Sequence, residues 1–448
     1  MIVLQLLLVI LFCVCGVLTG IVTGLLPGLH VNNIALILLS LSGTIVTTFS
    51  FLFAYGISEQ FILVLISVYI VSTSISHTFH DVIPSTFLGV PDEDKALSVL
   101  PTHSLLLEGK GYEAVALSAM GSYGAILFCF LLIYPIRFVI GEPLFFYKSL
   151  REIMLFVLIA ISIIMIGTEK AKINDFGKKG ITPAILGMLF AMFVFVLSGV
   201  FGIVTFNISV DSPIGLSSPV LFPALSGLFG TPTLLTSLMT KPVIPKQTIK
   251  DPVLDRKTKK SSVMSVMTGS LGGIFVSIIP GITSATGTVL AMNARGVSSK
   301  RQTIVTLSAV NTACAFCVVA VMFITLRARS GATLAVIDLI SVSEWTTLLM
   351  PTNLAYLLIA LLLGGTLSYF LTLKIGKIFA KHFVNAPYAL IVKLTIALIV
   401  ILVFLFTGPI GVFILVVATL IGLLPIQWGV RRSHCMGILL IPIILYFL

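Results

Sequence analysis

The chain has 448 residues, of which 58% are hydrophobic and only 10% are charged, and its formal net charge is +11. Soluble domains carry roughly 25% charged residues, so a chain this long with so few charges cannot cover a surface that faces water. The composition excludes a soluble globular protein and predicts a multi-pass protein of the cell membrane. The basic residues fall in short loops and form no basic soluble domain, so we also exclude a nucleic-acid-binding protein.

Two long stretches contain no charged residue, one before Glu59 and one between Lys393 and Arg431. A membrane-spanning helix needs about 20 apolar residues, so each stretch is long enough for two crossings. Apolar segments recur along the chain at 2–26, 31–50, 55–77, 112–136, 152–168, 180–206, 212–238, 263–279, 282–294, 303–326, 331–350, 352–373, 387–407, 409–425 and 435–448. Several are too short to span alone. The pattern predicts an all-α transmembrane helical bundle with about 10 to 12 spans plus re-entrant pieces.

Basic residues gather in two polar loops, residues 169–179 with four lysines and residues 239–262 with seven lysines or arginines. Loops rich in lysine and arginine stay on the cytoplasmic side, so we expect both inside. The second loop is the best candidate for a linker. We therefore predict an N-terminal transmembrane repeat (1–238), a cytoplasmic basic linker (239–262) and a C-terminal transmembrane repeat (263–448).

Arg295, Lys300 and Arg301 follow the next apolar stretch. They share the cytoplasmic side with the 239–262 loop if residues 263–294 form a hairpin that does not cross the membrane.

An internal repeat links the two halves. The motif Gly16-x3-Gly20-x6-Pro27-Gly28 matches Gly269-x3-Gly273-x6-Pro280-Gly281 at a constant offset. Proline removes a backbone donor and clashes with the preceding turn, and glycine then lets the backbone unwind. The sequence predicts two structural repeats, inverted relative to each other, each with a broken or re-entrant helix.

Polar residues follow both breaks. They are His30, Asn32 and Asn33 in the first half, and Thr283, Ser284 and Thr286 in the second. At the start of a half-helix, free N–H groups and the positive end of the helix dipole favour an anion. The carbonyl end of the upstream half-helix would instead suit Na⁺ or a proton donor. We predict that these residues and the pairs Pro27-Gly28 and Pro280-Gly281 bind an anionic substrate.

The same motif has a second interpretation. GxxxG spacing is typical of close helix packing, and a Pro-Gly pair also occurs at ordinary kinks and at loops between full spans. Cys314 and Cys317 are spaced as CxxC but lie within an apolar run, so we interpret them as packing residues and not as metal or redox ligands.

A polar group ends the third apolar run. His77 and His80 are spaced to share a helical face, and Asp81 follows. These residues could couple transport to protons or to a cation, or they could form a cluster at the membrane interface. An aspartate within the bilayer costs about 2.5–3.5 kcal/mol, which makes function the default hypothesis if it lies there. No further ligand accompanies the histidines, so we predict neither a metal site nor a cofactor.

Four stretches carry a family resemblance. They are 24–29 with 34–39, Ile83-Pro84-Ser85-Thr86-Phe87-Leu88-Gly89-Val90-Pro91, 107–111 with Ala114 and Ala116, and Pro280-Gly281. Together they resemble the TctA family, the large membrane subunit of tripartite tricarboxylate transporters. His30 and Asn32 stand where the family usually has small residues, so the chain looks like a divergent branch similar to TctA-like membrane proteins common in archaea.

The resemblance implies a secondary transporter that works with a small membrane subunit and an extracytoplasmic binding protein. We expect an organic anion, carried with H⁺ or Na⁺, and we assign Ser85 and Thr86 to substrate binding. The alternative is a translocase for a polyprenyl-phosphate lipid, whose phosphate head would suit two helix N-termini. The chain has no HExxH or GxSxG motif, so we expect no enzyme. The sequence leaves a homodimer open.

Overall fold

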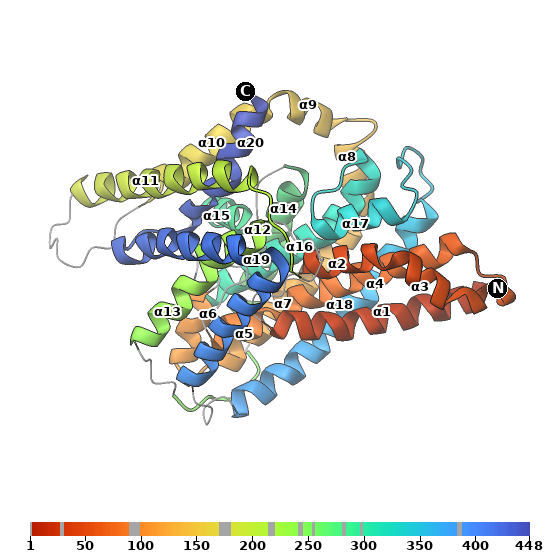
Figure 1. The fold of residues 1–448 in the computed structure, drawn as a ribbon, viewed down its shortest axis with the longest axis horizontal. Coiled ribbons are helices and arrows are strands. Elements are labelled where there is room, and N and C mark those ends of the chain that lie inside the picture. Colours follow the sequence, from red (N-terminus) through yellow and green to blue (C-terminus); the bar gives the residue numbers. More distant parts are fainter. Residues whose placement is uncertain are drawn as a thin grey trace.

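The computed structural model describes residues 2–26, 31–88, 99–169, 181–213, 220–240, 245–252, 256–279, 284–295, 299–382 and 388–448. Within these residues every regular element is a helix, as Figure 1 shows. The predicted all-α fold class is therefore confirmed.

The helices differ widely in length, and short helices separate the long ones. In chain order they are α1 (Ile2–Leu25), α2 (Val31–Ser40), α3 (Ser42–Thr48), η1 (Ser50–Tyr55), α4 (Glu59–His80), α5 (Val82–Phe87), α6 (Val99–Leu107), α7 (Gly111–Leu131), α8 (Ile133–Ile140), α9 (Phe146–Glu152), α10 (Met154–Gly167), α11 (Ile181–Phe206), α12 (Leu221–Leu225), η3 (Ser226–Gly230), α13 (Thr231–Thr240), α14 (Arg256–Ile278), α15 (Ser284–Arg295), α16 (Lys300–Thr325), α17 (Gly331–Leu339), α18 (Thr352–His382), α19 (Tyr388–Trp428), η5 (Arg432–Met436) and α20 (Gly437–Phe447).

Both predicted breaks coincide with helix ends. The first gap lies between Leu25 of α1 and Val31 of α2, and the second between Ile278 of α14 and Ser284 of α15. One offset of 253 residues relates the two gaps and also the two prolines within them. Each upstream helix ends two residues before its proline, because proline disfavours helix in the residue before it. The Pro-Gly pairs themselves lie outside the described residues.

The first repeat unit comprises α1, α2, α3 and α4. Gly16, Gly20 and Gly24 of α1 face successively later residues of α4, which are Ser72, Ser76 and His80. Helices α1 and α4 therefore run in the same direction, and α2 and α3 return the chain between them (Figure 1).

The second repeat unit comprises α14, α15 and α16. Gly269 and Gly273 of α14 face Ala309 and Ala313 of α16, so these two helices are also parallel. Helix α15 folds back antiparallel along α14, since Gly287 lies beside Val276 while Gly272 lies beside Ala291.

The starts of α14 and α16 lie together, because Gln302 donates a hydrogen bond to the hydroxyl of Ser261. The segment between them therefore returns to the end of the bundle at which it began. This arrangement places the starts of α14 and α16 at one end of the bundle, although α14 is itself long and apolar enough to cross a membrane.

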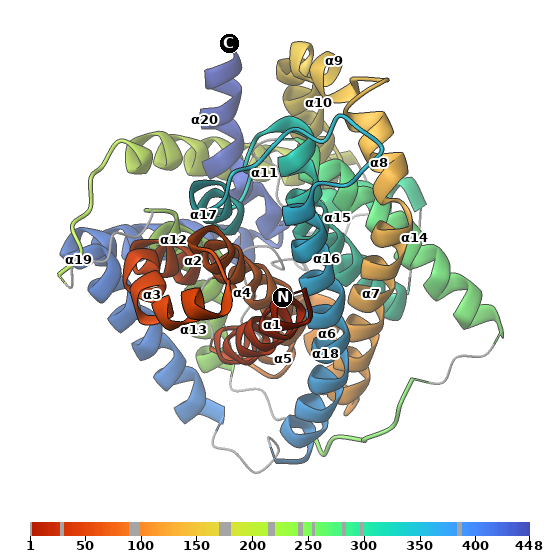
Figure 2. The ribbon, with the colours of Figure 1, turned by 90° about the vertical axis from the view of Figure 1, so that its right-hand side faces the viewer.

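The two units run in opposite senses. Helix α7 begins where Gly111 meets the ring of Phe87, just after the first unit ends. At the same place Arg301 of α16 forms an ion pair with Glu113 of α7, with 2.6 Å between Nε and Oε1. The C-terminal end of the first unit and the N-terminal end of α16 therefore lie at the same end of the bundle. The two units are inverted relative to each other, as predicted. Figure 2 shows α7 beside α16 and α18.

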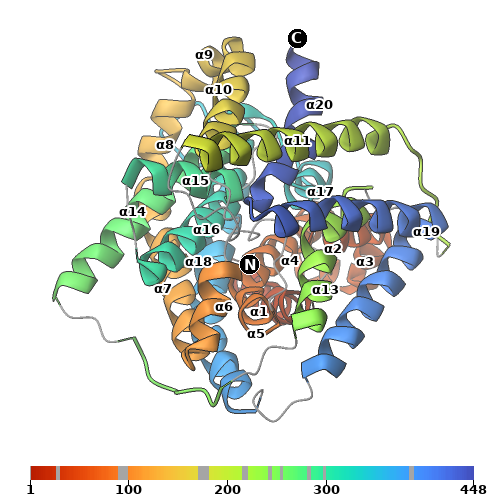
Figure 3. The same ribbon diagram turned by 90° about the vertical axis from the view of Figure 1, so that its left-hand side faces the viewer.

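Among the described residues, nine helices are long and apolar enough to cross a membrane, and the pair α9–α10, bent by 75°, would make a tenth. Helix α19 bends at Gly408, whose φ of 65° favours glycine (Figure 3). Its arms, 388–407 and 409–428, correspond to two separate apolar segments of the sequence.

Part of the basic 239–262 segment lies against the turn between α6 and α7. The Gln247 side chain accepts a hydrogen bond from the Gly111 N–H at 2.8 Å and donates to the Leu106 carbonyl at 3.1 Å. Asp251 accepts a hydrogen bond from the Tyr112 hydroxyl at 2.6 Å. Residues 245–252 are therefore held on the N-terminal half, and the division into two repeats and a linker stays a prediction.

Candidate functional site

The C-terminal end of α4 and the short helix α5 contain a group of buried polar side chains. His80, Ser85 and Thr86 have no exposed surface, and Asp81 and His77 are 4% and 7% exposed. All five were assigned to the site from the sequence, in which they lie within the stretch 77–86. A buried charge or imidazole costs free energy unless it is hydrogen-bonded, so each of these side chains needs a polar partner.

Helix α1 supplies the neighbours of the two histidines. The Nδ1 atom of His77 lies 3.1 Å from the hydroxyl oxygen of Thr23, four residues before the first proline. His80 lies across from Gly24, where a Cβ would come within 2.8 Å of the His80 Cβ. The imidazoles are therefore placed beside the last turn of the broken helix α1.

The proton of His80 can be assigned from its partner. Its Nδ1 atom lies 2.8 Å from the backbone oxygen of Ser76. A carbonyl oxygen accepts hydrogen bonds and does not donate them, so Nδ1 carries a proton. In the neutral ring Nε2 is then the nitrogen that carries no proton.

Helix α5 continues the site toward α6. The Ser85 hydroxyl donates to the Asp81 carbonyl at 2.8 Å, and His103 of α6 donates from Nδ1 to the Thr86 carbonyl at 3.2 Å. Burial lowers the pKa of His103, and the bond to Thr86 opposes that shift. The sequence did not suggest His103, because it is separated from α5 by residues 89–98.

The second unit carries different side chains at the corresponding position. The helix contacts set the register: the Tyr69 and Thr73 carbonyls face Gly16 and Gly20, as the Thr306 and Val310 carbonyls face Gly269 and Gly273. In this register His77 corresponds to Cys314, and His80 to Cys317. The two histidines of the first unit are therefore replaced by thiols in the second.

Ser284 opens helix α15 and is 2% exposed. Its hydroxyl donates to the Oδ1 atom of Asn311 in α16 at 3.0 Å. The amide of Asn311 thus lies at the start of the half-helix that follows the second break, a position that sequence reasoning missed. Polar residues on long apolar helices such as α16 offer no pattern that tells a site from a packing contact.

The remaining predicted site residues are not described. Pro27, Gly28, His30, Pro280, Gly281 and Thr283 lie outside the described residues, and so do the side chains of Asn32, Asn33 and Thr286. Their assignment to substrate binding stays a prediction. Within the described part of the chain no group of His, Cys, Asp and Glu residues could hold a metal ion.

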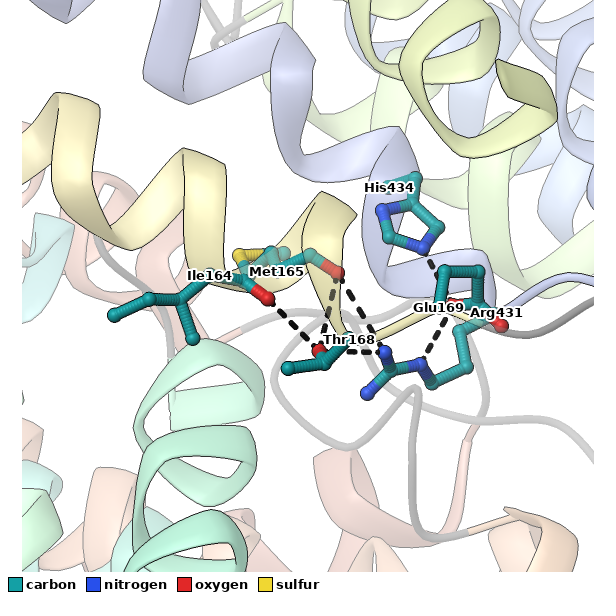
Figure 4. A network of polar contacts seen from close by, with 6 residues as sticks. All are labelled: Ile164, Met165, Thr168, Glu169, Arg431 and His434. Atoms are coloured by element: carbon teal, nitrogen blue, oxygen red, sulfur yellow. Dashed lines mark hydrogen bonds and ion pairs between the residues drawn. The ribbon is translucent and has the colours of Figure 1, made fainter. Parts of the chain in front are cut away.

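A second buried cluster lies far along the chain, where α10 meets η5 (Figure 4). Glu169 is 4% exposed and accepts hydrogen bonds from His434 Nε2 at 2.7 Å and Arg431 Nε at 2.6 Å. Arg431 also donates to the Thr168 hydroxyl at 2.9 Å. The Glu169 carboxylate thus joins the end of α10 to Arg431 and His434, and we interpret the cluster as a tie between α10 and η5.

The bundle, with its two inverted units each interrupted at a matched position, defines a multi-pass membrane protein built from inverted repeats. A family model described as the tripartite tricarboxylate transporter TctA family matches residues 10–437. The chain belongs to this family. It is therefore a membrane component of a secondary transporter, in a family of transporters.

The chain is also similar to an uncharacterized protein of Methanocaldococcus jannaschii, with 28% identity over 446 residues that cover 98% of this chain and 99% of the relative. No solved structure matches the chain.

Proposed function

We propose that this transporter carries an organic anion of the carboxylate type, coupled to H⁺ or Na⁺, and that the anion binds between the two broken helices. The observation that carries the proposal is the buried group of His77, His80 and Asp81 beside the last turn of α1. In transporters built from inverted repeats, substrate and coupling-ion sites lie at the interrupted helices.

The two sides of each break have different chemistry. The helix that follows a break offers free N–H groups to a carboxylate, and in the second unit Ser284 stands at that point. The helix that precedes a break offers carbonyl oxygens, which suit a cation. The imidazoles and the carboxyl group beside α1 supply exchangeable protons, so anion and coupling ion would bind close together.

Partners follow from the family. Members of this family work with a small membrane subunit and a periplasmic binding protein, and we propose equivalents for this chain. The binding protein would deliver the anion to the outer end of the bundle. Co-purification with tagged neighbours of the gene tests this part separately.

The test is uptake of a panel of mono-, di- and tricarboxylates by proteoliposomes under an imposed pH or Na⁺ gradient. Asp81→Asn and His80→Gln should each reduce gradient-driven uptake about tenfold or more. Both should leave exchange of internal for external anion largely intact, because exchange needs no net movement of the coupling ion.

His382→Gln is the matched control, since His382 is exposed at the end of α18 and bonds to the Ile378 carbonyl. It should transport like the wild type. Uptake that no gradient drives, or an Asp81→Asn variant that stays fully coupled, would reject the coupling role. Movement of a polyprenyl-phosphate lipid in vesicles that carry no carboxylate would replace this proposal with the lipid translocase.

A further inference from the structure

We propose that Arg329 is a built-in cation at the carbonyl end of α14, so that the exchangeable coupling ion belongs to the N-terminal unit alone. This inference rests on the proposed function, because it assigns the coupling site to one of the two breaks. It concerns a residue that lies outside both Pro-Gly motifs.

The contacts of Arg329 are with the last turn before the second break. Its guanidinium group donates from one terminal nitrogen to the Val276 carbonyl and from the other to the Ile279 carbonyl. The last carbonyls of a helix have no partner within the helix and carry partial negative charge. In a membrane protein such groups must be satisfied by protein, water or an ion, and here a side chain of the protein satisfies two of them.

The loop that carries Arg329 is itself fixed. Leu326 ends α16 with a φ of 53°. The Thr333 hydroxyl accepts hydrogen bonds from the backbone N–H groups of Arg329, at 3.0 Å, and of Ser330, at 2.9 Å. Ser330 caps α17 in return, accepting from the Thr333 N–H at 3.2 Å. The guanidinium group is thus held in place before any ligand arrives.

The first unit differs at the same point. The offset of 253 residues relates Val276 to Thr23. Beside Thr23 stands the imidazole of His77, with its Nδ1 atom 3.1 Å from the Thr23 hydroxyl, whereas Val276 has the guanidinium group of Arg329 on its carbonyl. A guanidinium group occupies the carbonyl end of α14, and an imidazole lies beside the last turn of α1.

Melting temperatures of the purified protein test this assignment. They are measured in NaCl and in choline chloride at equal ionic strength. Arg329→Ala should melt below the wild type in choline and should regain part of the loss in NaCl, because Na⁺ can replace the missing charge. Arg329→Lys keeps a charge and should melt near the wild type in both salts.

Arg327→Gln is the control, since Arg327 is an exposed arginine two residues away, and it should match the wild type. Two results would overturn the inference: an Arg329→Ala variant that responds to Na⁺ no more than the wild type does, or an Arg329→Lys variant that loses as much stability as Arg329→Ala. If the alanine variant does not fold, the lysine variant still decides between charge and shape. Because melting needs no transported anion, this test is independent of whether the chain carries carboxylates.

Discussion

Gly20 of α1 and Ser76 of α4 are in such close contact that a Cβ on Gly20 would lie 2.5 Å from the Cβ of Ser76. The Ser76 hydroxyl donates to the Val17 carbonyl at 2.9 Å and closes the same contact. In the second unit a Cβ on Gly273 would lie 2.4 Å from the Val310 carbonyl oxygen. The GxxxG halves of the repeated motif therefore serve helix packing, and the break that follows them is a separate feature.

Gly20→Ala and Gly273→Ala should both destabilise the protein, because each added methyl group must push two helix backbones apart. We expect about 1–3 kcal/mol for each, the usual cost of overpacking. Melting in detergent measures the effect. Gly43→Ala in α3 is the control, since a Cβ there meets nothing within 4 Å and alanine favours helix. Equal melting temperatures for all three variants would contradict the packing role.

The inverted orientation predicts which residues can be labelled from each side of the membrane. Lys260 lies in the first turns of α14, at the end of the bundle where α4 finishes, and Tyr55 lies just before α4 begins. Basic segments remain in the cytoplasm. Lys260→Cys should therefore resist an impermeant thiol reagent added to intact cells, and Tyr55→Cys should react.

Both labelling variants are made in a background with Cys15→Ser, because Cys15 is the exposed cysteine. Lysed cells provide the control in which both positions react. Labelling of Lys260→Cys in intact cells would reverse the orientation of the whole bundle without changing the relation between its two units.

The buried carboxyl group of Glu169 should make stability depend on pH. Burial alone raises the pKa of Glu169, but the hydrogen bonds from His434 and Arg431 outweigh it, and the pKa falls below the ordinary value of 4.5. A lowered pKa means that the folded state gains stability above the ordinary value and loses it as the pH falls through the lowered one. The melting temperature should therefore drop on acidification below about pH 4.5.

Glu169→Gln removes the charge and should cost about 1.5–3 kcal/mol at neutral pH, the range for hydrogen bonds to charged groups. It should also lose the part of the acid dependence that Glu169 causes. Glu152→Gln in α9 alters an exposed carboxylate and should leave both quantities unchanged. If the melting temperature of Glu169→Gln fell on acidification as much as that of the wild type, Glu169 would not be the cause of the acid dependence.

The sequence predicted best those structural features whose cause lies in neighbouring residues of the chain. Proline acts on the turn that precedes it, so the ends of α1 and α14 could be placed from Pro27 and Pro280. His77, His80 and Asp81 could be proposed because charged and titratable groups are rare in a run this apolar.

Arg329 could not be found in the same way. Its partners are backbone carbonyls about 50 residues earlier in the chain, and every residue has a backbone carbonyl. The preceding arginine, Arg327, belongs to the same short loop, and nothing in the local pattern tells the two apart. The contact exists because α16 and α14 are parallel, which is a property of the fold.

The helix contacts also differ in kind, since some join backbone to backbone and others involve side chains. A Cβ on Gly121 of α7 would meet the backbone oxygen of Val305 in α16 at 2.5 Å, so α7 is locked to the second unit. Along α18, by contrast, Gly365 and Gly376 face the side chains of Ile126 and Val115 of α7, which can change rotamer. Rocking of one repeat against the other would then be accommodated where α18 contacts α7 and α4 through side chains, while α7 moves together with α16.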